Sequence, residues 1–382
     1  MGKKITAPVS TRTDKKIKSE CYNNLTHSNY NISDDENTIL TFGIEHREAV
    51  ENIQHELTHK FQPKKNKTYP LADCYFRIGE DRRAERVINC GTYLEFVRED
   101  NSSSCKLNSA NFCRDRLCPM CSWRRTYKIY GQVSRVMDVI ENDYEFIFLT
   151  LTVPNVKSSD LPKKIDDMQK AFKQMIQFDK RIKKICAGYF KALEVTHNKN
   201  RYSKSFDTYH PHFHVIIAVH KGYFSGADYI RQSDWLSIWR RVMHDNSITQ
   251  VDVRKCKNVS TSESEQANKS ISSAVAEVAK YAVKDSDYLI PWSQTLTDSS
   301  VKTFLSSLAS RRLVSFGGIF YKVKQQLKLD DVEDGDLVHV DGYKLRNDVA
   351  LQIYRWGWSC GTYKLIAIEK KESVLIEYDE EN

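Results

Sequence analysis

The sequence predicts an α+β fold built on a central antiparallel sheet with helices. Between residues 146 and 288, strand-like and helix-like segments follow one another as strand, helix, strand, strand, helix, strand, helix. This is the order of the split βαβ, ferredoxin-like arrangement, with one helix added at its end. A cysteine-rich segment at residues 90–121 precedes these elements. We expect a small zinc-binding region there, before the central sheet.

The composition narrows the class of protein. The chain has 382 residues, 40% of them hydrophobic and 11% aromatic, which is enough for two or three domains with apolar cores. No run approaches the roughly 18 apolar residues of a membrane span. The first four residues, Met1 to Lys4, lead into polar sequence without an apolar signal-peptide core. We therefore expect a cytoplasmic protein with no membrane partner. A net charge of +8 favours a polyanionic partner.

Composition also divides the chain into five parts. Residues 1–40 are rich in Lys, Ser, Thr and Asn, which predicts a flexible polar tail. Residues 41–87 have helical potential. We expect a cysteine-rich region over 88–130 and the main α+β domain over 140–292. The remaining part, 293–382, is the expected place for DNA binding or partner binding.

Ten cysteines in a chain without a leader argue for thiols or metal ligands rather than disulfides. Cys118 and Cys121 form a C-x2-C pair, whose spacing lets two thiolates bind one tetrahedral zinc ion. Cys113 is the expected third ligand. Cys90 is favoured as the fourth because a glycine follows it, as in a tight knuckle, whereas the alternative, Cys105, lies in a Ser/Asn-rich segment. We expect structural zinc here. A cluster of reduced thiols in a small core is the alternative.

Two groups of basic residues are candidates for phosphate contact. One consists of four arginines next to the cysteines. The other is a helix expected over 160–186, where eight Lys or Arg against three Asp occur within residues 163–184. A solvated surface is the alternative for both. The four arginines are Arg114, Arg116, Arg124 and Arg125.

The elements of the main domain follow from hydrophobic periodicity. Residues 146–153 are apolar and β-branched, which is typical of a strand, and Pro154 ends it. The helix over 160–186 carries apolar residues at helical spacing, among them Ile165 and Phe172. The remaining expected elements are strands over 188–196, 209–219 and 248–254 and helices over 225–244 and 267–288.

Three histidines occupy every second position of the strand over 209–219. His210, His212 and His214 therefore share one face of it. Two imidazoles spaced in this way can hold one divalent cation; a pair of solvated or core histidines is the alternative. Glu194 lies in the middle of the preceding apolar strand, and a buried carboxylate needs a cation or hydrogen-bond donors. A hairpin of these two strands would bring Glu194 beside His212 and His214, unless Glu194 is a surface charge on an edge strand.

The last expected helix supplies a possible second half of the site. Glu277 and Tyr281 are four residues apart and share one helix face, Lys284 lies one turn further on, and Tyr288 follows Tyr281 by seven residues. A phenol is a poor nucleophile at neutral pH because its pKa is about 10. A nearby metal or lysine favours the phenolate. The alternative is a tyrosine packed on the sheet beside an ordinary Glu–Lys pair.

These segments resemble the three motifs of plasmid rolling-circle replication initiators, the Rep proteins of small Gram-positive plasmids within the HUH endonuclease superfamily. The motifs are the strand Phe148–Val153, the element His212-Phe213-His214, and Glu277-x-x-Lys280-Tyr281-x-x-Lys284-x-x-Asp287-Tyr288. The flanking segments 112–125, 315–318 and 334–337 also resemble the family. The resemblance covers about residues 88–340 and implies a sheet of the HUH endonuclease type.

The resemblance implies a metal-dependent, site-specific single-strand endonuclease that also rejoins DNA. His212 and His214 would bind Mg²⁺ or Mn²⁺. Tyr281 would be the nucleophile that forms a 5′-phosphotyrosyl link, and Glu277 would activate water for the terminating hydrolysis. Tyr288 would be a reserve nucleophile, since some HUH enzymes use two tyrosines.

Two further site residues come from the sequence itself. We infer Glu194 as a third metal ligand from its strand position, and Lys284 as a catalytic neighbour of the tyrosine. His210 is expected beside the metal site or facing DNA. The expected partners are plasmid origin DNA, with the nick site in a hairpin loop, a host helicase and a host DNA polymerase; a homodimer is one possible assembly. The alternatives are a zinc-dependent DNA-binding regulator, an HUH relaxase or transposase, and a phosphoesterase without covalent catalysis.

Overall fold

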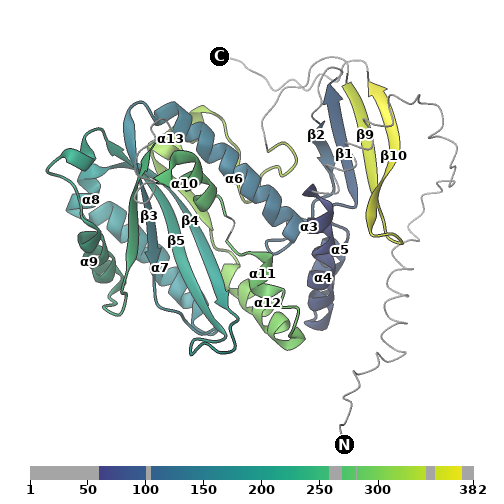
Figure 1. The fold of residues 1–382 in the computed structure, drawn as a ribbon, viewed down its shortest axis with the longest axis horizontal. Helices are drawn as coiled ribbons and strands as arrows, with labels where there is room; N and C mark the ends of the chain where they lie inside the picture. The colour runs from purple at the N-terminus through teal and green to yellow at the C-terminus, as the bar shows by residue number, and fades with distance from the viewer. Residues whose placement is uncertain (1–59, 100–104, 258–268, 281, 341–348, 372–382) are drawn as a thin grey trace, which may run out of the picture. The chain divides into compact units, whose positions relative to one another are not determined.

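The computed structural model describes residues 60–99, 105–257, 269–280, 282–340 and 349–371 (Figure 1). The tail expected over 1–40 lies outside the described residues, and so do residues 41–59 of the helical region expected over 41–87. Tyr281 also lies outside them. No helix within the described residues is both long enough and apolar enough to cross a membrane.

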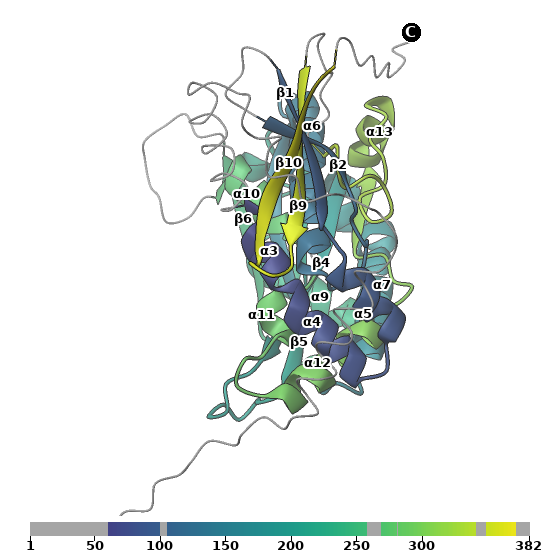
Figure 2. The ribbon, with the colours of Figure 1, turned by 90° about the vertical axis from the view of Figure 1, so that its right-hand side faces the viewer.

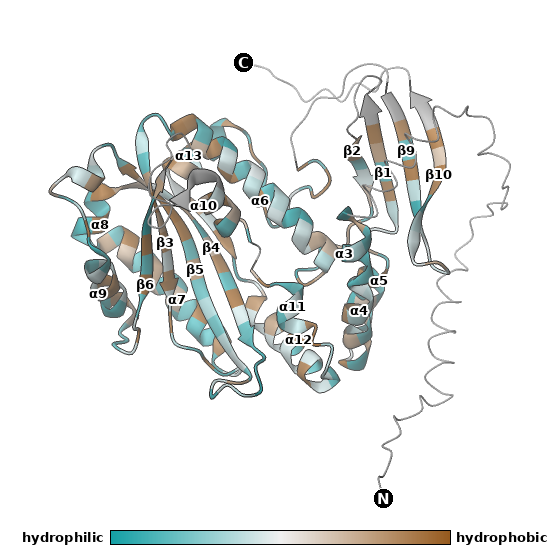
Figure 3. Ribbon diagram, viewed as in Figure 1, coloured by the Kyte–Doolittle hydropathy of each residue, from teal (hydrophilic) through white to brown (hydrophobic). Residues whose placement is uncertain are grey.

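The central sheet has six strands in the order β7-β6-β3-β5-β4-β8. Its four inner strands are antiparallel neighbours, and β5 lies between β3 and β4, which is the strand order of the split βαβ arrangement. The predicted fold class is therefore confirmed. The strands are β3 (Tyr144–Thr152), β4 (Cys186–Asn198), β5 (Thr208–His220), β6 (Val251–Lys257), β7 (Lys269–Ser270) and β8 (Val314–Gly318). Hydrophobic stretches run along β3, β4 and β5 (Figure 3).

Helices cover both faces of this sheet (Figure 1). On one face, α7 (Leu161–Phe178) packs against α9 (Gln232–Met243), and the Phe172 ring lies 5.9 Å from that of Phe213 on β5. On the other face, α6 (Pro119–Ile140) contacts α10 (Ile271–Val278) and α13 (Ile319–Gln326). Strand side chains alternate between the faces, so His212 and His214 point to the α6 side, away from Phe213.

Two expected helices are interrupted. The helix predicted over 160–186 breaks at Asp179, whose backbone is extended and whose side chain accepts hydrogen bonds from the first amides of α8 (Lys180–Ile185). The helix predicted over 267–288 is also wrong as a single element, since α10 ends at Val278 and α11 (Asp285–Tyr288) follows separately. The backbone N–H of Val195 donates to the carbonyl of Ala282 at 2.8 Å. The chain thus leaves the helix to pair with the outer edge of β4.

The described residues before and after the central sheet form further elements. The helices are α3 (Gln62–Asn66), α4 (Thr68–Arg77), α5 (Asp81–Ile88) and α12 (Gln294–Leu308). A second, four-stranded antiparallel sheet has the order β10-β9-β1-β2 (Figure 2). Its strands are β1 (Tyr93–Glu99), β2 (Cys105–Ala110), β9 (Val349–Gly357) and β10 (Thr362–Lys371). Two of the four strands therefore come from beyond residue 340, and the first of them, β9, pairs with β1 of the chain that follows Cys90.

Candidate functional site

The register of the central sheet brings three candidate metal ligands together. Glu194 on β4 lies opposite His212 on β5, and His214 follows on the same face. The Oε2 atom of Glu194 is 3.2 Å from His212 Nε2 and 2.9 Å from His214 Nε2. All three residues are buried. The hairpin predicted to join them is therefore present, and the three residues form a possible metal site.

The spacing of these atoms fits one divalent ion. Ligand atoms that lie 2.0–2.2 Å from a common ion at right angles are about 3 Å from one another. The two imidazole-to-carboxylate distances have this value. His212 Nδ1 lies 3.2 Å from the carbonyl of His210. If Nδ1 donates there, Nε2 turns a lone pair toward the carboxylate, and a cation between them would satisfy both groups.

Electrostatics favour the ligand forms of two of these side chains. Burial by itself would raise the pKa of Glu194, but contacts with His212, His214 and Lys284 outweigh it, and the pKa lies well below its usual value. Burial lowers the pKa of His214, which favours the neutral imidazole that binds metals. Lys284 Nζ is 2.7 Å from Glu194 Oε1, as an ion pair rather than a well-directed hydrogen bond. His210 is not among the three clustered ligands, and its ring stacks on that of His212 at 5.3 Å.

The chain on both sides of residue 281 is tied to this cluster. On α10, Glu277 Oε1 is 3.8 Å from His214 Nε2, and its Oε2 is 2.6 Å from Lys280 Nζ. On the other side, Ala282 bonds to Val195, the residue after Glu194. Glu277 and Lys284 therefore contact the candidate metal ligands directly, and Lys280 reaches them through Glu277, although no continuous helix connects these residues.

Tyr288 lies in a different environment. Its side chain is 1% exposed, and its hydroxyl donates to the carbonyl of Leu117. Burial raises the pKa of Tyr288 well above its usual value. A phenol that is buried, protonated and bonded to a carbonyl cannot attack a phosphate. This placement argues against the reserve-nucleophile role expected for Tyr288 and gives the residue a packing role.

The four expected cysteines form a second cluster. The Sγ atoms of Cys90, Cys113, Cys118 and Cys121 lie within 4.8 Å of one another. Cys121 Sγ is 3.6 Å from that of Cys90 and 3.7 Å from that of Cys113. Four thiolates around a tetrahedral zinc ion, each at 2.3 Å, are about 3.8 Å apart, so the cluster fits zinc. Cys105 lies on β2 and is not in the cluster.

Local backbone conformation shapes this cysteine cluster. Gly91 has a φ of +67°, which a glycine adopts without strain, so the chain turns sharply after Cys90. The backbone N–H of Arg114 donates to Cys121 Sγ at 3.2 Å, and that of Cys113 donates to Cys90 Sγ at 3.4 Å. Amide donors directed at sulfur stabilise thiolates, as in metal sites.

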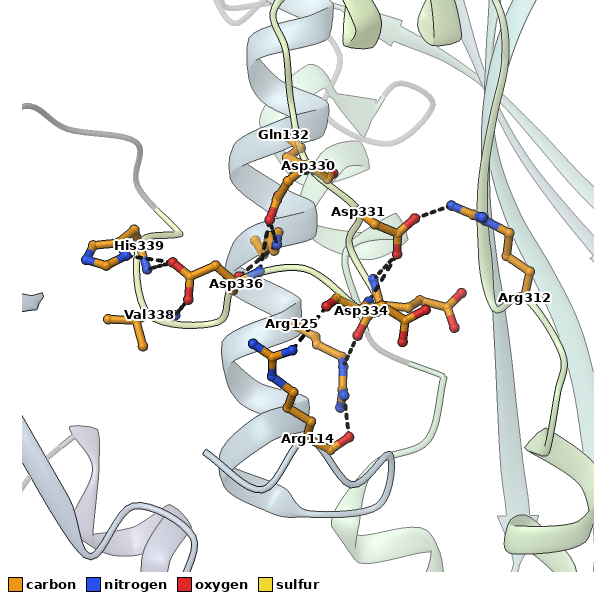
Figure 4. A network of polar contacts seen from close by, with 12 residues as sticks. Arg114, Arg125, Gln132, Arg312, Asp330, Asp331, Asp334, Asp336, Val338 and His339 are labelled. Atoms are coloured by element: carbon orange, nitrogen blue, oxygen red, sulfur yellow. Dashed lines mark hydrogen bonds and ion pairs between the residues drawn. The ribbon is translucent and has the colours of Figure 1, made fainter. Parts of the chain in front are cut away.

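Three of the four arginines beside the cysteines are buried or partly buried and make internal contacts. Arg124 and Arg125 are buried, and both donate to backbone carbonyls. Figure 4 shows Arg125 beside the carbonyl of Arg114, to which it also donates. Arg116 pairs with the buried carboxylate of Glu333 at 2.9 Å. Arg114 donates to the carbonyl of Asp334 at 3.3 Å. Arg124 and Arg125 thus hold residues 333–338 against α6 and do not face solvent, whereas Arg114 is exposed and agrees with the solvated alternative.

Sequence reasoning missed one group in the centre of the domain. Lys191 on β4 is 5% exposed, and its Nζ lies over the rings of Phe172 and Phe213, at 4.7 and 4.3 Å from their centroids. Its Nζ also donates to Gln169. A lysine within an otherwise apolar strand was the available signal, the same signal that identified Glu194 three residues later.

The fold and the two clusters define an α+β protein with a candidate divalent-metal site on its central sheet and a second site of four cysteines. A family model named Rep_1 and described as "Replication protein" matches residues 104–364. The chain belongs to this family of replication proteins. The resemblance to Rep proteins drawn from the motifs is thereby confirmed.

Several bacterial proteins named "Protein rep" are similar to this chain. One from a Bacillus species is 38% identical over 270 residues, which cover 68% of this chain and 85% of that protein. One from Streptococcus pneumoniae is 34% identical over 275 residues, which cover 70% of this chain and 80% of that protein. One from Staphylococcus aureus is 40% identical over 222 residues, which cover 57% of this chain and 89% of that protein. No solved structure matches the chain.

Proposed function

We propose that this protein initiates rolling-circle replication of a plasmid by nicking one strand of the double-strand origin with Tyr281. The observation that carries the proposal is the joint placement of Glu194, His212 and His214 with Glu277, 3.8 Å from His214. Membership of a replication-protein family supports a DNA substrate. The net charge of +8 agrees with a polyanionic one.

In this proposal, a divalent ion, Mg²⁺ or Mn²⁺, held by His212, His214 and Glu194 would polarise the scissile phosphate. The phenolate oxygen of Tyr281 forms a bond to the phosphorus, and the bond from phosphorus to the 3′ oxygen breaks. The leaving oxygen takes up a proton and becomes a 3′-OH, from which a host polymerase extends the strand. Lys284, which contacts Glu194, supplies positive charge at the edge of the site.

Termination would use Glu277. Its carboxylate lies beside His214 and can accept a proton from a water molecule that attacks the phosphotyrosyl bond. That hydrolysis releases Tyr281 and leaves a 5′-phosphate. A single tyrosine then suffices for the cycle, which agrees with the buried position of Tyr288. Unwinding of the template would require a host helicase, and the scissile strand would be presented in a hairpin loop because the chemistry needs single-stranded substrate.

The proposal is tested with Tyr281→Phe and an oligonucleotide carrying the origin hairpin. With Mn²⁺ or Mg²⁺, the wild-type protein should nick the oligonucleotide and form an adduct that denaturing gels resolve. Tyr281→Phe should form neither product. Full nicking by Tyr281→Phe would refute the assignment of the nucleophile. Origin binding without nicking or adduct by the wild-type protein would favour the alternative of a zinc-dependent DNA-binding regulator.

A further inference from the structure

A groove beside the proposed nick site has no role in the chemistry described above. It has a volume of about 320 Å³. Three stretches of chain line it: the end of α3 with the residue that follows, the first two turns of α6, and Lys280 with residues 283–286. Lys280 and Lys284 contact Glu277 and Glu194, so the groove lies next to the candidate metal site.

The groove is positively charged. Four lysines and one aspartate are its ionisable lining residues. Lys64 on α3 has no carboxylate partner among the residues that the structure describes, and Lys67 pairs with Asp285 at 2.8 Å. Lys280 and Lys284 contact Glu277 and Glu194 of the site. A polyanion in the groove would therefore meet Lys64 and three further lysines that also contact carboxylates.

An aromatic ring completes the lining. Trp123 on α6 is half-buried and borders the groove. Its ring meets those of Phe61 and Tyr127 edge-on, with centroids 4.9 and 5.4 Å away. Tyr127 and Tyr130 continue the stripe at helical spacing and are 46% and 40% exposed. Lysines that contact phosphates, together with rings on which bases stack, are the usual means of binding single strands.

We propose that this groove binds the single-stranded DNA next to the nick, with phosphates on Lys64 and Lys67 and a base stacked on Trp123. The inference rests on the proposed function for the identity of the ligand and adds the path of the strand. Lys284 contacts Glu194, and Lys280 contacts Glu277, which lies beside His214. A strand bound in the groove would therefore continue to the place where the scissile phosphate is expected. A duplex would not bind in this way, because its bases are stacked on one another and cannot stack on Trp123.

The test measures binding of the full-length protein to a short fluorescein-labelled oligothymidine by fluorescence anisotropy, without divalent metal. Trp123→Ala should weaken binding about tenfold, and Trp123→Phe should retain most of the affinity because a ring remains. Lys64→Glu should also weaken binding and should lower the dependence of log K on log salt by about one. Tyr321→Ala and Lys322→Glu on α13 are matched controls, since both side chains are exposed and outside the groove.

Equal affinities for Trp123→Ala and Tyr321→Ala would overturn the proposal. Because Trp123 also packs on Phe61, thermal unfolding of Trp123→Ala is measured first; if that variant is unfolded, Lys64→Glu against Lys322→Glu decides. The oligothymidine contains no cleavage site, so the result is independent of Tyr281. If the groove variants lose affinity but the wild-type protein forms no DNA adduct, the nicking proposal is refuted and the groove proposal stands. If the groove variants keep their affinity while the wild-type protein nicks the origin, the groove proposal alone is refuted.

Discussion

At the scale of single residues, Glu194 is the side chain on which the candidate metal site most depends. It accepts contacts from two histidines and from Lys284, and it supplies the negative charge of the cluster. We expect Glu194→Ala to weaken Mn²⁺ binding at least tenfold, because removing a ligand should cost at least as much affinity as removing a group that hydrogen-bonds to a ligand. Isothermal titration of Mn²⁺ into both proteins measures this. An affinity equal to that of the wild type would show that Glu194 is not a ligand.

Lys191 should make stability depend on pH. Burial lowers its pKa to about 7 in the folded protein, whereas an unfolded lysine has a pKa of about 10.4. Between these values the unfolded chain binds more protons than the folded one, so stability should rise with pH by up to about 1.4 kcal/mol per unit. Below pH 7 both states are protonated and this contribution is constant. Lys191→Met should remove the rise.

Urea unfolding of both proteins at a series of pH values between 7 and 10.4 measures this difference. The wild type should gain stability relative to Lys191→Met as the pH increases. Parallel curves for the two proteins would show that Lys191 stays charged when buried. The substitution preserves length and apolar contact with Phe172 and Phe213, so a cavity does not confound the comparison.

The clustering of the three candidate metal ligands could be predicted residue by residue, but the placement of the arginines could not. Strand side chains alternate with a period of two, so His212 and His214 had to share a face, and a charge in an apolar strand pointed to Glu194. By contrast, a guanidinium that donates to buried carbonyls looks the same in sequence as one that faces solvent. Arg124 and Arg125 depend on residues more than two hundred positions away, which local pattern does not reveal.

At the scale of elements, the strand β8 depends on close approach to β4. Gly317 lies opposite Tyr189, and a Cβ at Gly317 would come within 2.3 Å of the Tyr189 ring. We expect Gly317→Ala to destabilise the protein by about 1–3 kcal/mol, because a packed ring must shift. Gly131→Ala is the control. It lies inside α6 with only the Val340 carbonyl near, at 3.5 Å, and should stabilise by up to about 1 kcal/mol.

Thermal unfolding of the two alanine variants and the wild type tests this contrast. Gly317→Ala should have the lowest midpoint and Gly131→Ala the highest. If Gly317→Ala unfolded at the wild-type temperature, the β4–β8 contact would not contribute to stability as described. The prediction concerns only the folded domain, so it does not depend on the proposed activity.

The existence and order of the strands could be predicted, whereas the ends of helices could not. Hydrophobic periodicity located all four inner strands within a few residues, because β3, β4 and β5 are long and apolar and β6 begins with alternating apolar and polar residues. The helix expected over 267–288 fails between Val278 and Asp285, where the Ala282 carbonyl accepts a bond from Val195. The hydrogen bond joins this segment to a strand nearly ninety residues earlier in the chain. Helix propensity depends on the local sequence alone and cannot predict such a contact.

At the scale of the whole molecule, one buried contact relates the cysteine cluster to the proposed site. Leu117 precedes Cys118, and its carbonyl accepts the Tyr288 hydroxyl at the end of α11. His197 on β4 lies 3.0 Å from the Asp287 carbonyl, next to that tyrosine. α11 therefore contacts both the segment that leads into Cys118 and the strand that carries Glu194. Loss of order at the cysteine cluster would reach α11 through Leu117.

This arrangement predicts one zinc ion per chain, bound without Cys105. The four clustered sulfurs have the spacing of a tetrahedral site, and Cys105 lies apart from them on β2. Native mass spectrometry should find one zinc in the wild type and in Cys105→Ser, and none in Cys90→Ser. Cys90→Ser should also unfold at a lower temperature, since structural zinc contributes directly to folding free energy. Loss of zinc from Cys105→Ser with retention in Cys90→Ser would reverse the assignment. Zinc-free wild-type protein of unchanged stability would instead identify the cluster as reduced thiols in a small core.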